Sequence, residues 1–326
     1  MLVALACASP ARAADIVAYH STGLFGAVGY EATVVWGRGE YLLDLWVRVG
    51  KDTANLAKNR QAAESALEKR LEAVFLQSVV NLTVSSAETV GQRLKTNPAL
   101  LPAIRRLLQG AVKRGSAMDQ AMEDLRLYYA IPLYGADGLL SLLSPAGRPS
   151  PFESYLGFVP AAAYTGLVIY VQGSYPAWGR DGAEATLKPC LFPRIYDTNL
   201  DLVMDASRAD RARLLSWGLV AYSNDLDEAS FAERVGSNPL RTVARGIYGV
   251  NDTDVVISLD MAHRLLSREE NTRLLREGRV LLVLDAQSAP PPSPEANAAG
   301  DTELQVLGAG GAPTSTARPA GSGTGY

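Results

Sequence analysis

The chain has 326 residues, of which 48% are hydrophobic, and its formal net charge is −3. This length can bury a sizeable core and accommodates two domains. The charge balance argues against a nucleic-acid partner, because phosphate contact requires a concentrated basic face. No run of apolar residues reaches the roughly eighteen of a transmembrane helix, so none is expected in the mature chain.

The first fourteen residues are typical of an export signal. An apolar stretch over 2–8 precedes the small-residue pattern Ala11-Arg12-Ala13, which predicts cleavage before Ala14. No Lys or Arg precedes the apolar stretch, so an internal start at Met1 stays open as an alternative. The expected location is the periplasm or the periplasmic face of the outer membrane.

Cys7 leaves lipidation open as a second way of processing the signal. Bacterial lipoproteins are cut just before a cysteine that then carries lipid, usually with Leu three places earlier, whereas this chain has Ala4 there. In either cleaved form, Cys190 is the one cysteine available as a thiol, so no intramolecular disulfide is expected.

The first half of the chain predicts strands, then helices, then a strand. Glycines over 23–29 lack the spacing and the preceding strand of a phosphate loop, which favours a flexible leader that also contains His20. Asp52 is expected to cap the following long helix, and Gly110 to end a shorter one. The predicted elements are strands at 31–36, 41–49, 81–84 and 125–131, and helices at 52–80, 90–94 and 103–109.

The second half predicts alternating strands and helices. Capping-box-like sequences begin at Ser207 and Ser267, and Asn238-Pro239 is expected to open another helix. The expected strands are 166–171, 194–196, 200–204, 219–222, 254–258 and 279–284, and the expected helices are 207–218, 226–235, one from 238, and 267–278.

These elements predict an α+β protein with two small mixed domains, the second showing α/β-like alternation. The Pro- and Gly-rich stretch at 144–151 is the best domain boundary. The predicted organisation is a signal peptide at 1–14, domains at 28–145 and 150–286, and a disordered Pro/Gly/Ala-rich tail at 287–326.

The order of segments in 55–133 resembles the lipoprotein-20-like domain, whose relatives include flagellar basal-disk lipoproteins and an H-ring flagellar protein. The resemblance is carried by an Ala/Glu-rich helix, Thr89-Val-Gly and a strand ending in Ile131-Pro-Leu133. The second half resembles a block found behind that domain in exported bacterial proteins of unknown function. It is carried by Tyr164-Thr-Gly-Leu-Val-Ile169, Leu191-Phe-Pro-Arg-Ile-Tyr-Asp197, Asn238-Pro-Leu240, Thr253-Asp-Val-Val-Ile-Ser258 and Arg279-Val-Leu-Leu-Val-Leu-Asp285.

Two departures qualify what the resemblance implies. Relatives of the second block commonly follow its first strand with an Asp-Ala-Arg-Gly sequence, whereas this chain has Tyr170-Val-Gln-Gly173. The first domain's usual Asp-Gly hairpin is replaced by Gly115-Ser-Ala-Met-Asp-Gln120. The resemblance implies an envelope-associated, non-enzymatic protein, with a link to flagellar or surface assemblies.

Residues with catalytic or metal-binding chemistry are few. The two histidines, His20 and His263, offer little material for a metal site or a Ser-His-Asp triad, so no cofactor and no metal are expected. Asp197 to Asp201 imitates the start of a calcium loop but favours a hairpin turn, and Asn251 to Asp254 favours a turn over a metal or acid/base site. Cys190 favours a packed apolar role over a reactive thiol.

Four aromatic residues form a candidate ligand or partner surface, with core packing as the alternative. These residues are Tyr175, Trp178, Phe192 and Tyr196.

Three functions remain as hypotheses. The first is a structural or interaction protein of the cell envelope, with envelope or flagellar partners or self-association. The second is a periplasmic module that binds a small ligand or cell-wall fragment, and the third a metal-assisted hydrolase using Asp252 and Asp254.

Overall fold

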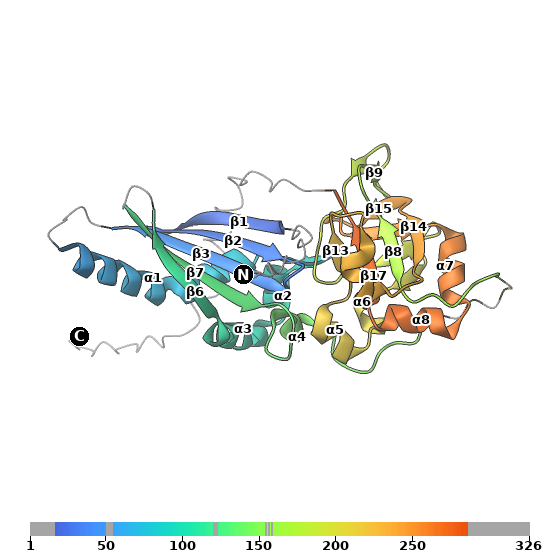
Figure 1. Cartoon of the computed structure of the whole chain (residues 1–326), viewed down its shortest axis with the longest axis horizontal. Coiled ribbons are helices and arrows are strands. Elements are labelled where there is room, and N and C mark those ends of the chain that lie inside the picture. Colours follow the sequence, from blue (N-terminus) through green and yellow to red (C-terminus); the bar gives the residue numbers. More distant parts are fainter. Residues whose placement is uncertain are drawn as a thin grey trace, which may run out of the picture. The chain divides into compact units, whose positions relative to one another are not determined.

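The computed structural model describes residues 17–49, 55–119, 123–153, 155, 157 and 159–285, which all fall in one compact unit, Met1–Pro292. The described chain is an α+β protein with two mixed domains (Figure 1). The predicted signal at 1–14 with Cys7, and the predicted tail at 287–326, lie outside the described residues. No helix of the described ranges combines the length and apolarity needed to cross a membrane.

The first domain is built on a five-stranded antiparallel sheet with the strand order β1-β2-β3-β7-β6. Its strands are β1 (Val17–Phe25), β2 (Val28–Val35), β3 (Glu40–Arg48), β6 (Val112–Met118) and β7 (Asp124–Pro132). The predicted strands at 31–36, 41–49 and 125–131 are confirmed as β2, β3 and β7, whereas β6 was not predicted.

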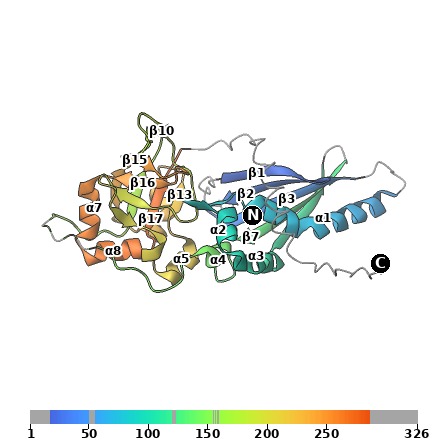
Figure 2. The same cartoon turned by 180° about the vertical axis from the view of Figure 1, so that it is seen from behind.

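The predicted long helix is confirmed as α1 (Leu56–Val79), which packs along one face of this sheet (Figures 1 and 2). Tyr41 of β3 meets Phe75 of α1 edge to face, with 5.7 Å between ring centroids, and its hydroxyl donates to Ser78 Oγ at 2.8 Å. Asn55 occupies the N-cap position but makes no side-chain capping bond, and the predicted cap, Asp52, lies outside the described residues.

The flexible leader predicted over 23–29 is wrong, because these residues belong to the β1–β2 hairpin. Gly23 pairs with Tyr30, and a Cβ on Gly23 would lie 2.8 Å from the Tyr30 hydroxyl, so the glycine lets the ring cover the strand. Gly26 turns the chain with φ 61°. The glycines therefore serve tight packing and a turn rather than flexibility.

Between the sheet strands, the first domain contains a small hairpin and short helices. These elements are β4 (Thr83–Ser85), β5 (Glu88–Thr89), α2 (Val90–Thr96), α3 (Leu101–Leu107) and, after β7, α4 (Leu139–Leu143). Single 3-10 turns at Pro98–Leu100 and Leu108–Gly110 flank α3. The helices predicted at 90–94 and 103–109 are thus confirmed, and α4 was missed.

The second domain contains a parallel sheet and a mixed sheet of four strands each. The parallel sheet has the order β13-β17-β8-β14, from Ala221–Ser223, Val280–Val283, Leu167–Tyr170 and Leu240–Val243. The mixed sheet has the order β12-β11-β16-β15, from Leu202–Met204, Ile195–Asp197, Asp254–Ile257 and Gly246–Tyr248. A two-stranded ribbon joins β9 (Tyr175–Pro176) and β10 (Glu184–Ala185).

The helices of this domain end mostly where glycines were expected to end them. Gly218, Gly236 and Gly278 all have positive φ and follow helical segments. The helices are α5 (Arg211–Trp217), α6 (Ala232–Val235, preceded by a 3-10 turn at Glu228–Phe231), α7 (Leu259–Leu266) and α8 (Glu269–Arg276).

The helix starts predicted at Ser207 and Ser267 are wrong. Asp210 caps α5 by accepting from the Arg213 N–H at 2.9 Å, while the Ser207 N–H and hydroxyl both donate to Asp205. The N-cap of α8 is Arg268, whose side chain makes no capping bond to the helix. Asp caps as well as Ser does, so the residue type alone does not decide which of the neighbouring polar residues caps the helix.

The helix predicted from Asn238-Pro239 is also wrong, because the chain continues into strand β14. Leu240 to Val243 pair in parallel register with Leu167 to Tyr170, and the Leu240 N–H donates to Gly166 O at 2.8 Å. Partners far away in sequence therefore override the local Asn-Pro signal. The strand predicted at 279–284 is confirmed as β17, buried along its length between two parallel neighbours.

Candidate functional site

Two of the four predicted aromatic residues lie together on one face of the mixed sheet. Trp178 follows β9, and its main-chain N–H donates to Ile247 O at 2.8 Å, which brings its side chain over Gly246 of β15. Tyr196 of β11 meets Tyr248 of β15 edge to face, with ring centroids 5.2 Å apart. We call this half-exposed set, Trp178, Tyr196 and Tyr248, the aromatic face.

Gly246 makes the aromatic face possible. A Cβ at this position would lie 2.1 Å from Trp178 Cδ1 and Nε1, so any other residue would push the indole away. Val256 of β16 pairs with both Gly246 and Tyr196, so the three side-chain positions form one row across the sheet. Sequence reasoning missed Tyr248, which an alternation of Gly246 and Tyr248 around Ile247 could have indicated.

A cation borders the aromatic face. Arg194 Nη1 donates to the Tyr196 hydroxyl at 3.4 Å. Burial raises the pKa of Tyr196, while Arg194 opposes that rise. The set can therefore offer flat ring surface next to a positive charge, the combination that suits a planar or sugar-like ligand with an anionic group.

The other two predicted aromatic residues lie elsewhere. Phe192 is buried, and its N–H donates to Val84 O of β4 at 2.8 Å, so it belongs to the contact between the two domains. Tyr175 lies beside the end of β8, where its hydroxyl donates to Tyr170 O at 3.4 Å. The four residues therefore do not form one surface.

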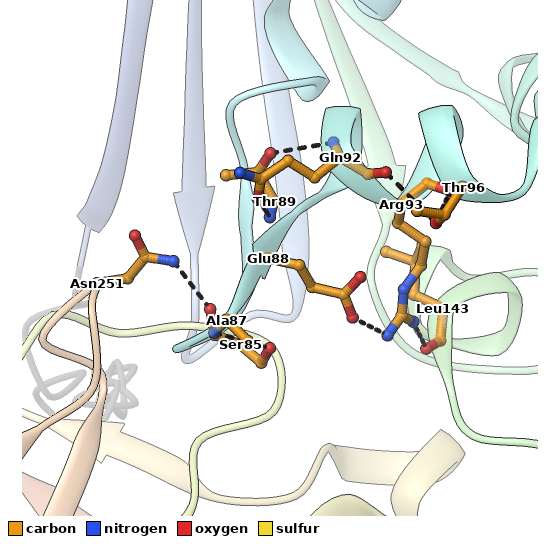
Figure 3. A network of polar contacts seen from close by, with 9 residues as sticks. All are labelled: Ser85, Ala87, Glu88, Thr89, Gln92, Arg93, Thr96, Leu143 and Asn251. Atoms are coloured by element: carbon orange, nitrogen blue, oxygen red, sulfur yellow. Dashed lines mark hydrogen bonds and ion pairs between the residues drawn. The ribbon is translucent and has the colours of Figure 1, made fainter.

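The β4–β5 hairpin of the first domain is held from both sides (Figure 3). On one side Arg93 of α2 donates to Glu88 and to Leu143 O, and Thr89 caps α2 through a capping box with Gln92. On the other side the second domain contributes Asn251, whose Nδ2 donates to Ser85 O at 3.1 Å.

Aromatic rings complete the contact between the domains. Trp36 at the end of β2 meets Tyr222 of β13 edge to face at 5.1 Å, and both are buried. The Tyr222 hydroxyl donates to Cys190 O and accepts from the Cys190 N–H. The two domains thus share an interface, which we call the junction. It consists of the Trp36–Tyr222 ring pair, the Phe192–Val84 main-chain hydrogen bond and the Asn251–Ser85 hydrogen bond.

The acidic residues after Asn251 do not converge on one point. Asp252, with φ 57°, forms ion pairs with Arg180 and Lys188, whereas Asp254 is fully buried and accepts from the Arg194 N–H at 3.0 Å. Asp254 Oδ2 has no hydrogen-bond partner. The described residues contain no cluster of three His, Cys, Asp or Glu side chains fit to hold a metal.

The remaining sequence candidates are used in local structure. Cys190 is fully buried, and burial raises its thiol pKa to about 12, which confirms the packed reading. The turn prediction for Asp197 is confirmed, since its Oδ1 accepts from the N–H groups of Asn199 and Asp201. His263 stacks on Tyr155 with centroids 3.8 Å apart, and His20 lies in β1.

One polar cluster was not predicted. At the carboxyl end of β8, Tyr170 donates to Glu228 Oε1, and Glu228 also accepts three hydrogen bonds from Arg241. The bond to Glu228 raises the pKa of Tyr170, and the bonds from Arg241 and Tyr170 outweigh burial and lower the pKa of Glu228. The carboxylate is therefore saturated by an ion pair and a phenol, an arrangement that ties β8, β14 and the Glu228–Phe231 turn together.

Two surface grooves flank α3, and neither was predicted. One of about 430 Å³ lies between α3 and α4, and one of about 530 Å³ lies between α3 and α1. Arg106 and Gln109 line both grooves.

Comparison with known proteins identifies both domains. Residues 27–136 match the family model of the N-terminal domain of Treponema pallidum Tp0624, and residues 166–286 match that of its second domain. No curated protein matches the chain. The finer assignment to a lipoprotein-20-like family with flagellar relatives has no counterpart among these matches. The chain is therefore a two-domain bacterial protein that is similar in both domains, and in their order, to Treponema pallidum Tp0624.

Proposed function

We propose that this protein is a non-enzymatic structural or interaction protein of the bacterial cell envelope, in a flagellar or other surface-associated assembly. The observation that carries the proposal is the junction. Rings, main-chain bonds and the Asn251 amide join the two domains into one body, which suits a part that holds a fixed shape between neighbours.

The contacts of the candidate catalytic residues support the same proposal. Asp252 is neutralised by two cations, Asp254 is buried, Asp197 closes its own turn and Cys190 is enclosed. Each group makes at least one structural contact, Asp254 through its Oδ1. The export signal predicted by the first fourteen residues supports the location.

Cell fractionation of the source bacterium, followed by chemical crosslinking and sizing, tests this proposal. We expect the protein in envelope fractions and in crosslinked species with envelope or flagellar proteins. A protein that stays freely soluble in periplasmic extracts and crosslinks to nothing would overturn the proposal.

A specific observation favours a second function, a periplasmic binding module that uses the aromatic face. Three half-exposed rings and Arg194 lie on one sheet face, with Gly246 beneath the indole. Amphipathic rings of this kind bind sugar-like ligands through stacking. Titration with soluble cell-wall fragments, followed by isothermal titration calorimetry, is expected to show saturable binding that Trp178→Ala abolishes.

Tyr175→Ala is the matched control for that titration. Tyr175 is an aromatic residue of the neighbouring β9 but contacts the end of β8 instead of the aromatic face. Binding retained by Tyr175→Ala and lost by Trp178→Ala would support the module. Absence of binding by the wild-type protein, or equal loss in both variants, would refute it.

A further inference from the structure

The two edge strands of the five-stranded sheet differ in the charged residues that they carry. Edge strand β6 carries Lys113, which forms ion pairs with Glu64 and Glu68 of α1 at 2.5 and 2.9 Å, and Arg114, which pairs with Glu40. Its register shifts between Lys113 and Gly115. Charges and a bulge are the devices by which proteins keep an edge strand from pairing with another chain.

The opposite edge strand, β1, lacks these devices over most of its length. Its nine residues, Val17–Phe25, include no Asp, Glu, Lys, Arg or Pro. A register shift affects only its start, between Val17 and Tyr19, so Tyr19 to Phe25 pair regularly with β2. Among the described residues, no strand pairs with the outer edge of β1.

Such an edge offers a row of main-chain donors and acceptors to another strand. It also presents an apolar side chain, because Leu24, which pairs with Gly29 next to the hairpin turn, is 66% exposed. Antiparallel addition of a strand would satisfy the main-chain groups and cover Leu24 in one step.

We propose that β1 is a dimerisation edge, at which it pairs antiparallel with β1 of a second copy and joins two five-stranded sheets into one. The regular segment has Thr22 at its midpoint, so a twofold axis there places Thr22 opposite its own copy. Thr–Thr pairs stabilise neighbouring strands. The same axis places Gly23 opposite Ser21 and Leu24 opposite His20, so no like charges oppose each other at neutral pH.

The absence of charge also makes β1 electrostatically compatible with a second copy of itself. A twofold axis places each side chain of the strand opposite a residue of the same strand, so any charged residue near the axis would face its own copy. β1 has none, and the whole chain carries a net charge of only −3. The proposal goes beyond the envelope function and stands independently of the protein's location.

Sedimentation velocity of the purified full-length chain tests the proposal. We expect a dimer at micromolar concentration for the wild type, and a dissociation constant raised at least about tenfold by Thr22→Lys, which places two ammonium groups opposite each other. Val112→Lys is the matched control, because Val112 is 52% exposed on the other edge strand. It should leave the dimer unchanged.

A crosslink decides the outcome even if Thr22→Lys fails to fold. In a Cys7→Ser background, with Cys190 buried, Thr22→Cys is expected to form a disulfide-linked dimer on mild oxidation. Directly opposed residues have Cβ atoms about 4.5–5.5 Å apart, so a small movement of the two strands would allow a disulfide to form. Ser116→Cys on β6 should stay monomeric.

A wild-type chain that is monomeric at about 100 µM would overturn the proposal, since an interface this weak would not be specific. A dimer that Thr22→Lys leaves intact, or that Ser116→Cys crosslinks as well as Thr22→Cys, would also overturn it. None of these results bears on envelope association, which is measured in cells.

Discussion

Two carboxyl groups that are buried or half-buried, those of Asp254 and Asp44, have a raised pKa. Asp254 sits within the mixed sheet at the junction, where burial raises its pKa against the opposing effects of Ser86, Arg194 and Thr253. Asp44 of β3 lies across from Glu31 of β2, and burial followed by the Glu31 charge raises its pKa to about 6. Both groups bind a proton more readily in the folded state than in the unfolded chain.

Asp254→Asn is expected to stabilise the protein at pH 7 by about 1–2 kcal/mol, because a neutral amide avoids the desolvation cost and can donate toward Ser86. Because the pKa of Asp254 is raised in the folded state, wild-type stability falls as pH rises above the unfolded pKa of 3.8. The variant lacks this contribution to the pH dependence of stability. Urea unfolding at pH 4 and 7 measures it. A variant less stable than the wild type at both pH values would contradict the prediction.

Asp44→Asn is also expected to stabilise the protein, at pH values above the unfolded pKa of Asp44. Between the unfolded pKa of 3.8 and the folded pKa of about 6, the folded wild type binds more protons than the unfolded chain, so its stability declines as pH rises. The variant should equal the wild type near pH 3.5 and exceed it above pH 6, by up to about 1 kcal/mol after solvent screening. Thr33→Ala, at a neighbouring position of β2, is the control. It keeps Asp44, so its difference in stability from the wild type should not change with pH.

Short helices of the first domain depend on their end residues because they have few turns. In α2, the Thr89 hydroxyl accepts from the Gln92 N–H at 3.3 Å and the Gln92 side chain accepts from the Thr89 N–H at 2.7 Å. This capping box satisfies donors that a seven-residue helix cannot satisfy internally. The sequence contained the signal in Thr89 and Gln92.

Thr89→Ala is expected to lower the free energy of unfolding by about 1 kcal/mol. Thr96→Ala at the other end of α2 is the matched control, because its hydroxyl bonds only to helix carbonyls and its loss should cost less than about 0.5 kcal/mol. Equal losses in the two variants would show that the capping box does not stabilise α2.

At the scale of the whole molecule, the junction is expected to make the two domains unfold together. Tyr222 contributes both a ring against Trp36 and two hydrogen bonds to Cys190. A second buried anchor is Arg234, which donates to the carbonyls of Trp217, Gly218 and Gly278 at the ends of α5 and α8. Burial lowers the pKa of Arg234 to about 10, which still leaves it charged at neutral pH.

Differential scanning calorimetry can separate the contributions of Tyr222. The wild type is expected to unfold in one transition. Tyr222→Phe keeps the ring and should lose about 1–2 kcal/mol within one transition, whereas Tyr222→Ala removes the ring, should lose about 3–5 kcal/mol and should resolve two transitions. Two transitions in the wild type, or one in Tyr222→Ala, would show that the junction does not couple the domains.

The sequence by itself determined the α+β class, most strands and the helix ends at Gly218, Gly236 and Gly278. These depend on local physics: residue alternation, helical spacing and the backbone freedom of glycine act over a few neighbours. The buried state of Cys190 and the turn at Asp197 were predictable for the same reason, because their immediate neighbours decide them.

Only the tertiary structure decided the rest. β1 and β14 became strands because β2 and β8 offered them main-chain partners, against local glycine and Asn-Pro signals. Phe192 lies at the junction, whereas Trp178 lies over Gly246, which is 68 positions further along the chain. Strand pairing and domain contact join residues that lie far apart in the chain, and their energy depends on a register and a burial that exist only once the chain has folded.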